Sequence, residues 1–271
     1  MGNLAVTIPP SLENLVRDFS NQSKISVDSL VGAALSTYLE SLTPRIYQVS
    51  TSTALVEGIY TGSHCSSTLL QHGDFGLGAF EGLDGEMIIL DGEIYQAAGT
   101  VRRRADEFLI PFAAVTQFRK MEIFEIGAVA CLKDIELACD QHRVSQNLFY
   151  AVRLDGVFDT MHTRAVHAVP QNTRLLDAAK AELEFHFDTV AGTLVCLWSP
   201  RYSSAFSVPG YHFHFLSDDR TKGGHVLNCT ARKLQASIQT IFEYDIRLPE
   251  TGSFLTTDLS KDPTSDLGKT E

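Results

Sequence analysis

The sequence predicts an α/β protein of the α+β kind. We expect a mixed β-sheet subdomain, then a β-rich subdomain that carries a metal site, preceded by a short helical extension. Two observations support this. From Ile46 onward, short runs of β-favouring residues are separated by glycine-containing turns. Residues 1–45 instead carry apolar residues at helical spacing. We therefore expect an extension over 1–45 and a main domain over 46–271, with subdomains at about 46–146 and 147–271.

Bulk composition narrows the class of protein. The 271 residues are 44% hydrophobic, enough for a full core. No apolar run reaches the roughly 20 residues of a membrane span, and the start lacks the basic and apolar regions of a signal peptide. The five cysteines form no CxxC pair, which favours reduced thiols over disulfides. We expect a soluble, cytoplasmic protein with no membrane partner.

The formal charge of −11 makes nucleic-acid binding by the whole chain unfavourable. The same charge repels an anionic small molecule at long range. An anionic substrate would therefore need a local cation at its binding site.

The N-terminal extension reads as strand, helix, helix. Leu4–Ile8 alternates like a short strand that Pro9 ends, and helices are expected over Ser11–Asn21, with its first serine as cap, and over Ser26–Leu42. This order resembles a ribbon-helix-helix module, which is dimeric and reads DNA. The predicted strand has no Lys or Arg to meet phosphates or bases. We favour a dimerising or packing element over DNA binding.

The remaining elements follow from alternation, glycine turns and helical spacing. The expected strands are Tyr47–Thr51, Glu86–Leu90, Glu93–Ala97, Leu109–Val115, Phe124–Cys131, Asn147–Arg153, Val157–Val166, Gly192–Trp198, Tyr211–Phe215, His225–Cys229 and Leu234–Asp245. The expected helices are Ser66–Gln71, Lys133–His142 and Asn172–Glu182, and the polar residues Ser253–Glu271 read as a frayed tail.

Three histidines form the strongest chemical signal. His212 and His214 alternate with aromatic residues, so a strand would place both on one face. A polar, glycine-bearing hairpin loop follows, and the returning strand begins at His225, across from the pair. Three such imidazoles could hold Zn²⁺ and leave a position for substrate. On spacing alone, metal binding and a filler role remain open alternatives. Cys229, on the expected same face, is a weaker candidate ligand.

Acidic residues in glycine-rich surroundings are the next candidates. Asp74 and Asp84 lie in segments where glycines predict turns, and we interpret Asp74 as a turn former. Glu86 opens an apolar run, so its carboxylate is expected at a strand start on the edge of an active site.

Among the cations, Arg164 stands between apolar residues and shares a strand face with His162. In an acidic protein an inward arginine is a candidate anion clamp. The run Arg102–Arg104 is interpreted as a solvated turn balanced by Asp106 and Glu107.

Taken together, these motifs resemble the alpha-acetolactate decarboxylase family. The matching strings, in the family's order, are His72–Gly78, Leu83–Glu86, Leu148–Ala151 through His162–Arg164, and Gly210–His212 through Gly223–His225. The resemblance covers the chain from about Tyr47 onward. It implies a dimeric, two-subdomain α/β enzyme that converts 2-acetolactate to acetoin and CO₂, with zinc, or another divalent metal, held by the three histidines.

The resemblance also implies roles for single residues. Arg164 matches the family's active-site arginine, Glu86 its glutamate near the metal, and Glu271 the glutamate that the family brings from the C-terminus. Ala79 stands where many members have threonine. The divalent ion would stabilise the enediolate left when CO₂ departs. Arg164 would orient the substrate, and Glu86 or Glu271 would move the protons. Two alternatives stay open: a metal-dependent lyase or isomerase for another hydroxy-keto acid, and a non-catalytic binding protein.

Overall fold

The computed structural model describes residues 5–40 and 43–269. The chain divides into two compact units, Met1–Thr43 and Pro44–Glu271, and each is described by itself. Within the described ranges, no helix is long and apolar enough to cross a lipid bilayer.

The N-terminal unit consists of α1 (Pro10–Ser23) and α2 (Val27–Glu40). Both helices lie where helical spacing predicted them. The expected serine cap is wrong: α1 begins with Pro10 at its first turn and has no side-chain cap, because proline needs no hydrogen-bond partner there. The expected strand over Leu4–Ile8 is also wrong for the described residues 5–8, which form no strand. A strand needs a partner for its backbone groups, and Leu4 lies outside the described residues.

The larger unit contains two main sheets, and the first is a seven-stranded one in the order β14-β1-β8-β3-β4-β5-β6. Its neighbours are antiparallel except β1 and β14, which run parallel. The strands are β1 (Arg45–Val49), β3 (Phe75–Ala79), β4 (Glu86–Leu90), β5 (Glu93–Ala97), β6 (Val101–Arg104), β8 (Phe112–Thr116) and β14 (Glu243–Arg247).

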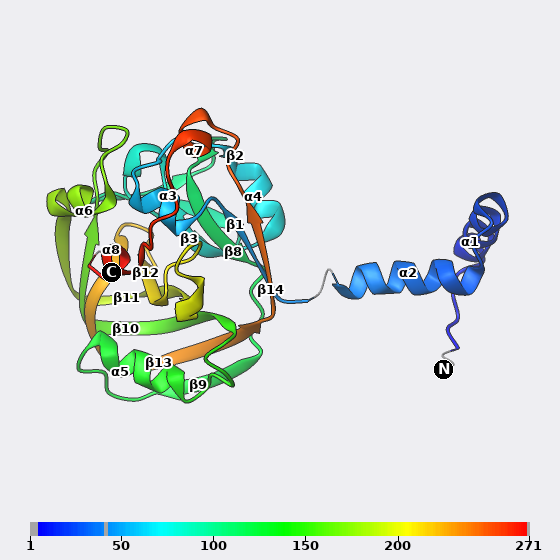
Figure 1. The fold of residues 1–271 in the computed structure, drawn as a ribbon. Coiled ribbons are helices and arrows are strands. Elements are labelled where there is room, and N and C mark those ends of the chain that lie inside the picture. Colours follow the sequence, from blue (N-terminus) through cyan, green and yellow to red (C-terminus); the bar gives the residue numbers. More distant parts are fainter. Residues whose placement is uncertain (1–4, 41–42, 270–271) are drawn as a thin grey trace. The chain divides into compact units, whose positions relative to one another are not determined.

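The second sheet has the order β10-β11-β12-β13-β9, and β10 also pairs with β13. Strands β10 to β13 therefore form a closed ring of pairings (Figure 1). Its strands are β9 (Glu122–Ile126), β10 (Phe149–Ala165), β11 (Leu183–Ser199), β12 (Gly210–Ser217) and β13 (Gly223–Ile241). Strand β9 joins this sheet from the first half of the chain, while β14 joins the first sheet from the second half.

Short elements complete the unit. They are α3 (Ser52–Val56), α4 (Ser66–His72), α5 (Leu132–Asp140), α6 (Leu175–Ala178), α7 (Gly252–Thr256), α8 (Thr264–Leu267) and the paired short strands β2 (His64–Cys65) and β7 (Leu109–Ile110). The helix expected over Asn172–Glu182 reduces to α6 and a 3₁₀ turn at Ala179–Ala181. The expected frayed tail is wrong for the described part, since α7 and α8 form there.

The second sheet packs against two apolar layers. One fills the ring of β10 to β13 and is rich in aromatic residues such as Phe158 and Phe215. The other lies between the sheets, where Leu77 and Ile88 of the first pack with Leu197 and others of the second. Burial of each such side chain stabilises the fold by about 1.5–3 kcal/mol. This second layer brings β12 against β4, and the candidate site forms at that contact.

Candidate metal centre and active-site pocket

His212, His214 and His225 converge from the hairpin of β12 and β13. His214 and His225 are direct cross-strand partners, and His212 lies two residues along β12 on the same face. The loop between the strands is closed by the backbone hydrogen bond from Ser217 N to Lys222 O at 2.9 Å. The hairpin predicted from the sequence therefore forms, and it gathers the three imidazoles.

The ring nitrogens are spaced as a metal centre requires. His212 Nε2 lies 3.2 Å from His214 Nε2 and 3.1 Å from His225 Nδ1. All three donor atoms lie within 4.8 Å of one another. Nitrogen ligands of tetrahedral zinc stand about 3.3 Å apart, so the observed spacing fits a divalent ion.

The surroundings of the histidines favour ligand chemistry. His214 Nδ1 donates to the backbone oxygen of Met87 in β4 at 2.8 Å, which turns Nε2 toward the cluster. Burial lowers the pKa of His214 to about 4, and burial, with the neighbouring rings and Arg164, lowers the pKa of His212 and His225. The imidazoles are therefore neutral at physiological pH, which is the form that binds metal.

Gly224 makes the approach of His225 possible. Its φ is +148°, and a Cβ atom there would stand 2.7 Å from the backbone oxygen of Arg164. Strand β13 thus runs close to β10 at the residue where His225 and Arg164 are cross-strand partners. A side chain at this position would push the two functional residues apart.

The expectation that Cys229 shares a face with His225 is wrong. The pairing of β13 with β10 shifts between Val226 and Asn228, so one extra residue inverts the alternation. Cys229 is 1% exposed and packs inside the ring of strands. Burial raises the pKa of its thiol to about 12, which disfavours the thiolate that would bind metal.

Glu86 reaches the cluster from the first residue of β4. Its Oε2 lies 3.5 Å from His214 Nε2. The tight turn before it includes Gly85, with φ +84°, where a Cβ atom would stand 2.6 Å from the backbone oxygen of Ala97. Burial raises the pKa of Glu86 to about 7, against the opposing effect of Arg164. A cation beside this carboxyl would favour its ionised form.

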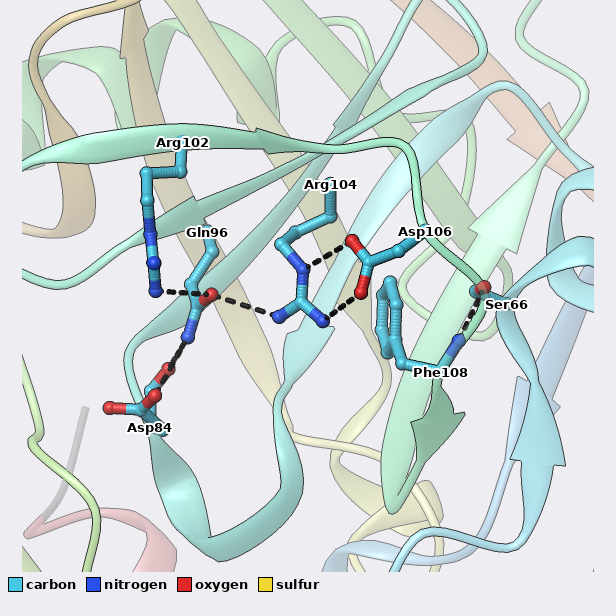
Figure 2. A network of polar contacts seen from close by, with 7 residues as sticks. All are labelled: Ser66, Asp84, Gln96, Arg102, Arg104, Asp106 and Phe108. Atoms are coloured by element: carbon cyan, nitrogen blue, oxygen red, sulfur yellow. Dashed lines mark hydrogen bonds and ion pairs between the residues drawn. The ribbon is translucent and has the colours of Figure 1, made fainter.

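Figure 2 shows a polar network that holds Asp84. The buried Gln96 of β5 donates to both the backbone and the side chain of Asp84. Its amide oxygen accepts from Arg102 at 3.3 Å and Arg104 at 3.0 Å, and Arg104 also binds Asp106 through two hydrogen bonds. Asp84 is therefore a structural anchor two residues before Glu86.

The same network corrects one expectation. Arg102–Arg104 belong to strand β6 and do not form a turn, because they pair in register with β5. Asp106 balances Arg104 as expected, but Glu107 accepts from Ser67 at 2.6 Å. Asp74 lies in the bend before β3 and accepts from Phe118 N at 2.8 Å, so it joins that bend to the segment after β8.

Arg164 enters the pocket from β10, where it is 9% exposed. Its Nη1 lies 2.7 Å from Glu182 Oε2. Sequence reasoning missed Glu182, because the segment before β11 was assigned to a helix. The alternation of Leu183, Phe185 and Phe187 with polar residues was a signal for a longer strand beginning there.

One cavity of about 70 Å³ joins these residues. It is lined by two of the histidines, Glu86, the pair of Arg164 and Glu182, Ala79 and apolar residues, the last including Leu55, Leu83, Phe112, Val166 and Leu175. The site thus offers three neutral imidazoles, a carboxyl and one cation inside an apolar wall.

Glu271 lies outside the described residues. The tail that precedes it is anchored: Leu267 of α8 is 1% exposed and packs with Val56 and Val208, against Leu175 of the pocket wall. Asp266 also lies 3.1 Å from Arg174. The described tail therefore ends beside the pocket wall.

The comparisons with known proteins agree with this site. Residues 46–261 match the family described as Alpha-acetolactate decarboxylase. The chain is 38% identical over 264 residues to the alpha-acetolactate decarboxylase of Methanosarcina mazei, covering 96% of this chain and 85% of that protein. It is 36% identical to that of Bacillus licheniformis over 220 residues, covering 80% and 87% of the two chains.

A solved structure supports the same assignment. The crystal structure of alpha-acetolactate decarboxylase from Bacillus subtilis strain 168 is similar with a TM-score of 0.81 and 35% identity, covering 84% of this chain and 99% of that one. The fold and these matches together place the protein in the class of carboxy-lyases, the enzymes that remove CO₂ from a substrate. This chain belongs to the alpha-acetolactate decarboxylase family.

Proposed function

We propose that this protein converts 2-acetolactate to acetoin and CO₂ with a divalent ion, zinc in the first place, held by His212, His214 and His225. The observation that carries the proposal is the convergence of these histidines with Glu86 and Arg164 on one small pocket. A divalent ion bound there would act as a Lewis acid that stabilises the negative charge developing as CO₂ leaves.

The chain's own residues bind and orient the substrate. Arg164 is the cation that attracts the carboxylate into a protein of net charge −11. Glu182 already accepts from Arg164, so the substrate carboxylate must share this guanidinium. The apolar wall formed by residues such as Leu83 and Phe112 excludes water from the carboxylate, which favours its loss as neutral CO₂.

We propose that Glu86 moves protons in the reaction, with Glu271 as the alternative carboxylate. Glu86 lines the pocket beside His214. Glu271 follows the buried Leu267 by four residues, and four residues span at most about 14 Å. Leu267 packs against Leu175 of the pocket wall, which supports Glu271 as the alternative carboxylate.

Glu86→Gln and removal of Glu271 distinguish these two carboxylates. Because protonation of one carbon face needs one donor, we expect one variant to lose about 10²- to 10⁴-fold in kcat and the other to lose far less. The measurement is steady-state kinetics, with bound metal determined in each variant. Equal, small effects in both variants would contradict the assignment of proton transfer to either carboxylate.

Incubation with racemic 2-acetolactate is the direct test of function. We expect CO₂ and acetoin to form, the reaction to stop after treatment with a metal chelator, and activity to return when Zn²⁺ is restored. No turnover by the metal-loaded protein would favour a lyase or isomerase that acts on another hydroxy-keto acid. Ala79 lies in the pocket wall. The resemblance implies a threonine at this position in many members, and a missing hydroxyl would lower the activity or shift the choice of substrate.

We also propose that the protein is a homodimer and that residues 1–43 contribute to its contact. Both helices expose apolar side chains; these are Leu12, Leu15, Phe19, Val31, Leu35 and Tyr38. Isolated helices of 14 residues are marginal in water, so these two need an apolar partner.

Removal of residues 1–43 tests the role of this unit. In sedimentation experiments, we expect the dimer of the deletion variant to dissociate at a higher protein concentration than the dimer of the full chain. The variant should keep its bound metal and its decarboxylase activity, because the pocket lies wholly in the larger unit. Unchanged dissociation would assign the dimer contact to the larger unit. A monomeric full chain would contradict the dimer itself.

The cytoplasm remains the proposed location. All five cysteines are free thiols, and Cys139, Cys196 and Cys229 are buried. Free thiols are the usual state of cysteine in a reducing compartment, which supports this proposal.

A further inference from the structure

A second group of potential metal ligands lies on the paired strands β10 and β11. His162 and His186 are direct cross-strand partners, and Glu184 is the neighbour of His186 on the same face of β11. None of the three lines the pocket described above. The group has no role in the decarboxylation proposed above.

The donor atoms of the group are already close together. His162 Nε2 lies 2.7 Å from Glu184 Oε2, and the rings of His162 and His186 stack with centroids 4.0 Å apart. One ligand atom from each residue lies within 4.8 Å of the others. The ladder of β10 and β11 fixes the three backbones, so little reorganisation is needed to bring the donors onto one ion.

The group is also open to solvent. The side chains of His162 and Glu184 are 27% and 52% exposed, and His186 is exposed. A hydrated cation can therefore reach the donors and keep water in its remaining positions. Where a cation binds, it replaces the hydrogen between His162 Nε2 and Glu184, and the neutral ring then carries its hydrogen on Nδ1.

We propose that His162, Glu184 and His186 form a second, solvent-facing site for a divalent transition-metal ion. Two imidazoles and one carboxylate are a ligand set that suits Zn²⁺, Ni²⁺ and Cu²⁺ and discriminates against Mg²⁺ and Ca²⁺. Because its ligands are exposed and its coordination is completed by water, this site binds more weakly than the buried three-histidine centre.

The second site lies beside the Arg164–Glu182 pair of the pocket. Glu184 is the cross-strand partner of Arg164, and Glu182 lies two residues before it. An ion held between β10 and β11 at this level ties together the strand ends that carry the Arg164–Glu182 pair. We therefore expect occupancy to stabilise this end of the ladder without contacting the substrate.

Titration with Zn²⁺ in a His212→Ala, His214→Ala background tests the second site independently of the first. We expect one weakly bound ion per chain by calorimetry in this background, and none after the further change His186→Ala. Cu²⁺ bound in the same background should show nitrogen hyperfine coupling in its electron paramagnetic resonance spectrum, and His186→Ala should remove it. The apparent melting temperature should rise with Zn²⁺ only while His186 is present.

His142 offers a matched control. It lies 2.6 Å from Glu122 and stacks on Phe124, so it forms a similar exposed His–Glu pair, but Phe124 stands where the second imidazole would be. His142→Ala should leave the weak ion in place. Three results would each overturn the proposal. The first is that His142→Ala loses the weakly bound ion just as His186→Ala does. The others are that His186→Ala keeps the ion, or that the background protein binds no weak ion at all.

Discussion

Replacement of His212 and His214 together by alanine is expected to remove the tightly bound ion and to lower the rate of decarboxylation by about 10³-fold. The two rings supply two of the three convergent nitrogens, and His225 alone cannot hold a divalent ion against water. Loss of about 4 kcal/mol of electrostatic transition-state stabilisation corresponds to about a 10³-fold fall in kcat. Metal content of the dialysed protein and initial rates with 2-acetolactate are the measurements.

The double variant needs a test of folding, because His214 is buried and donates to Met87 O. Loss of that buried hydrogen bond costs about 0.5–1.5 kcal/mol. Circular dichroism and the melting temperature therefore accompany the metal analysis, with His142→Ala as the control for a histidine outside the pocket. A folded double variant that keeps one tightly bound ion would remove the basis of the proposed metal centre.

The candidate centre could be predicted from sequence because its geometry is local. Alternation along a strand places His212 and His214 on one face, and a short hairpin returns the chain beside them at His225. Neither step depends on how the rest of the chain folds. Glu86 was predictable for a similar reason, since a glycine turn followed by an apolar run marks a strand start.

Other features depended on distant contacts, and sequence reasoning missed them. The bulge that turns Cys229 away from His225 arises where β13 pairs with β10, and no local pattern marks it. Strand β10 continues through Gly156, where two strands were expected, because β11 and β13 pair with it on both sides. The parallel partner of β1 comes from β14, almost 200 residues away along the chain.

A change of Arg164 to glutamine is expected to lower kcat/KM by about 10²- to 10³-fold, because a buried charge-assisted contact to the substrate carboxylate is lost. Most of the effect should appear in KM if Arg164 binds substrate and transition state equally.

Glu182→Gln should change KM in the direction opposite to Arg164→Gln. Without the Glu182 carboxylate, the guanidinium no longer divides its charge between a glutamate and the substrate, so KM for an anionic substrate should fall several-fold.

Arg153 supplies the matched control for this pair of changes. It lies on the same strand β10, its side chain is 19% exposed, and it forms ion pairs with Asp91 and Asp155 outside the pocket. Arg153→Gln should therefore leave both kinetic constants unchanged. If Arg164→Gln and Arg153→Gln had equal effects, the ion pair of Arg164 with Glu182 would have a structural role only. If Glu182→Gln raised KM instead, Glu182 would position the guanidinium more than it competes for it.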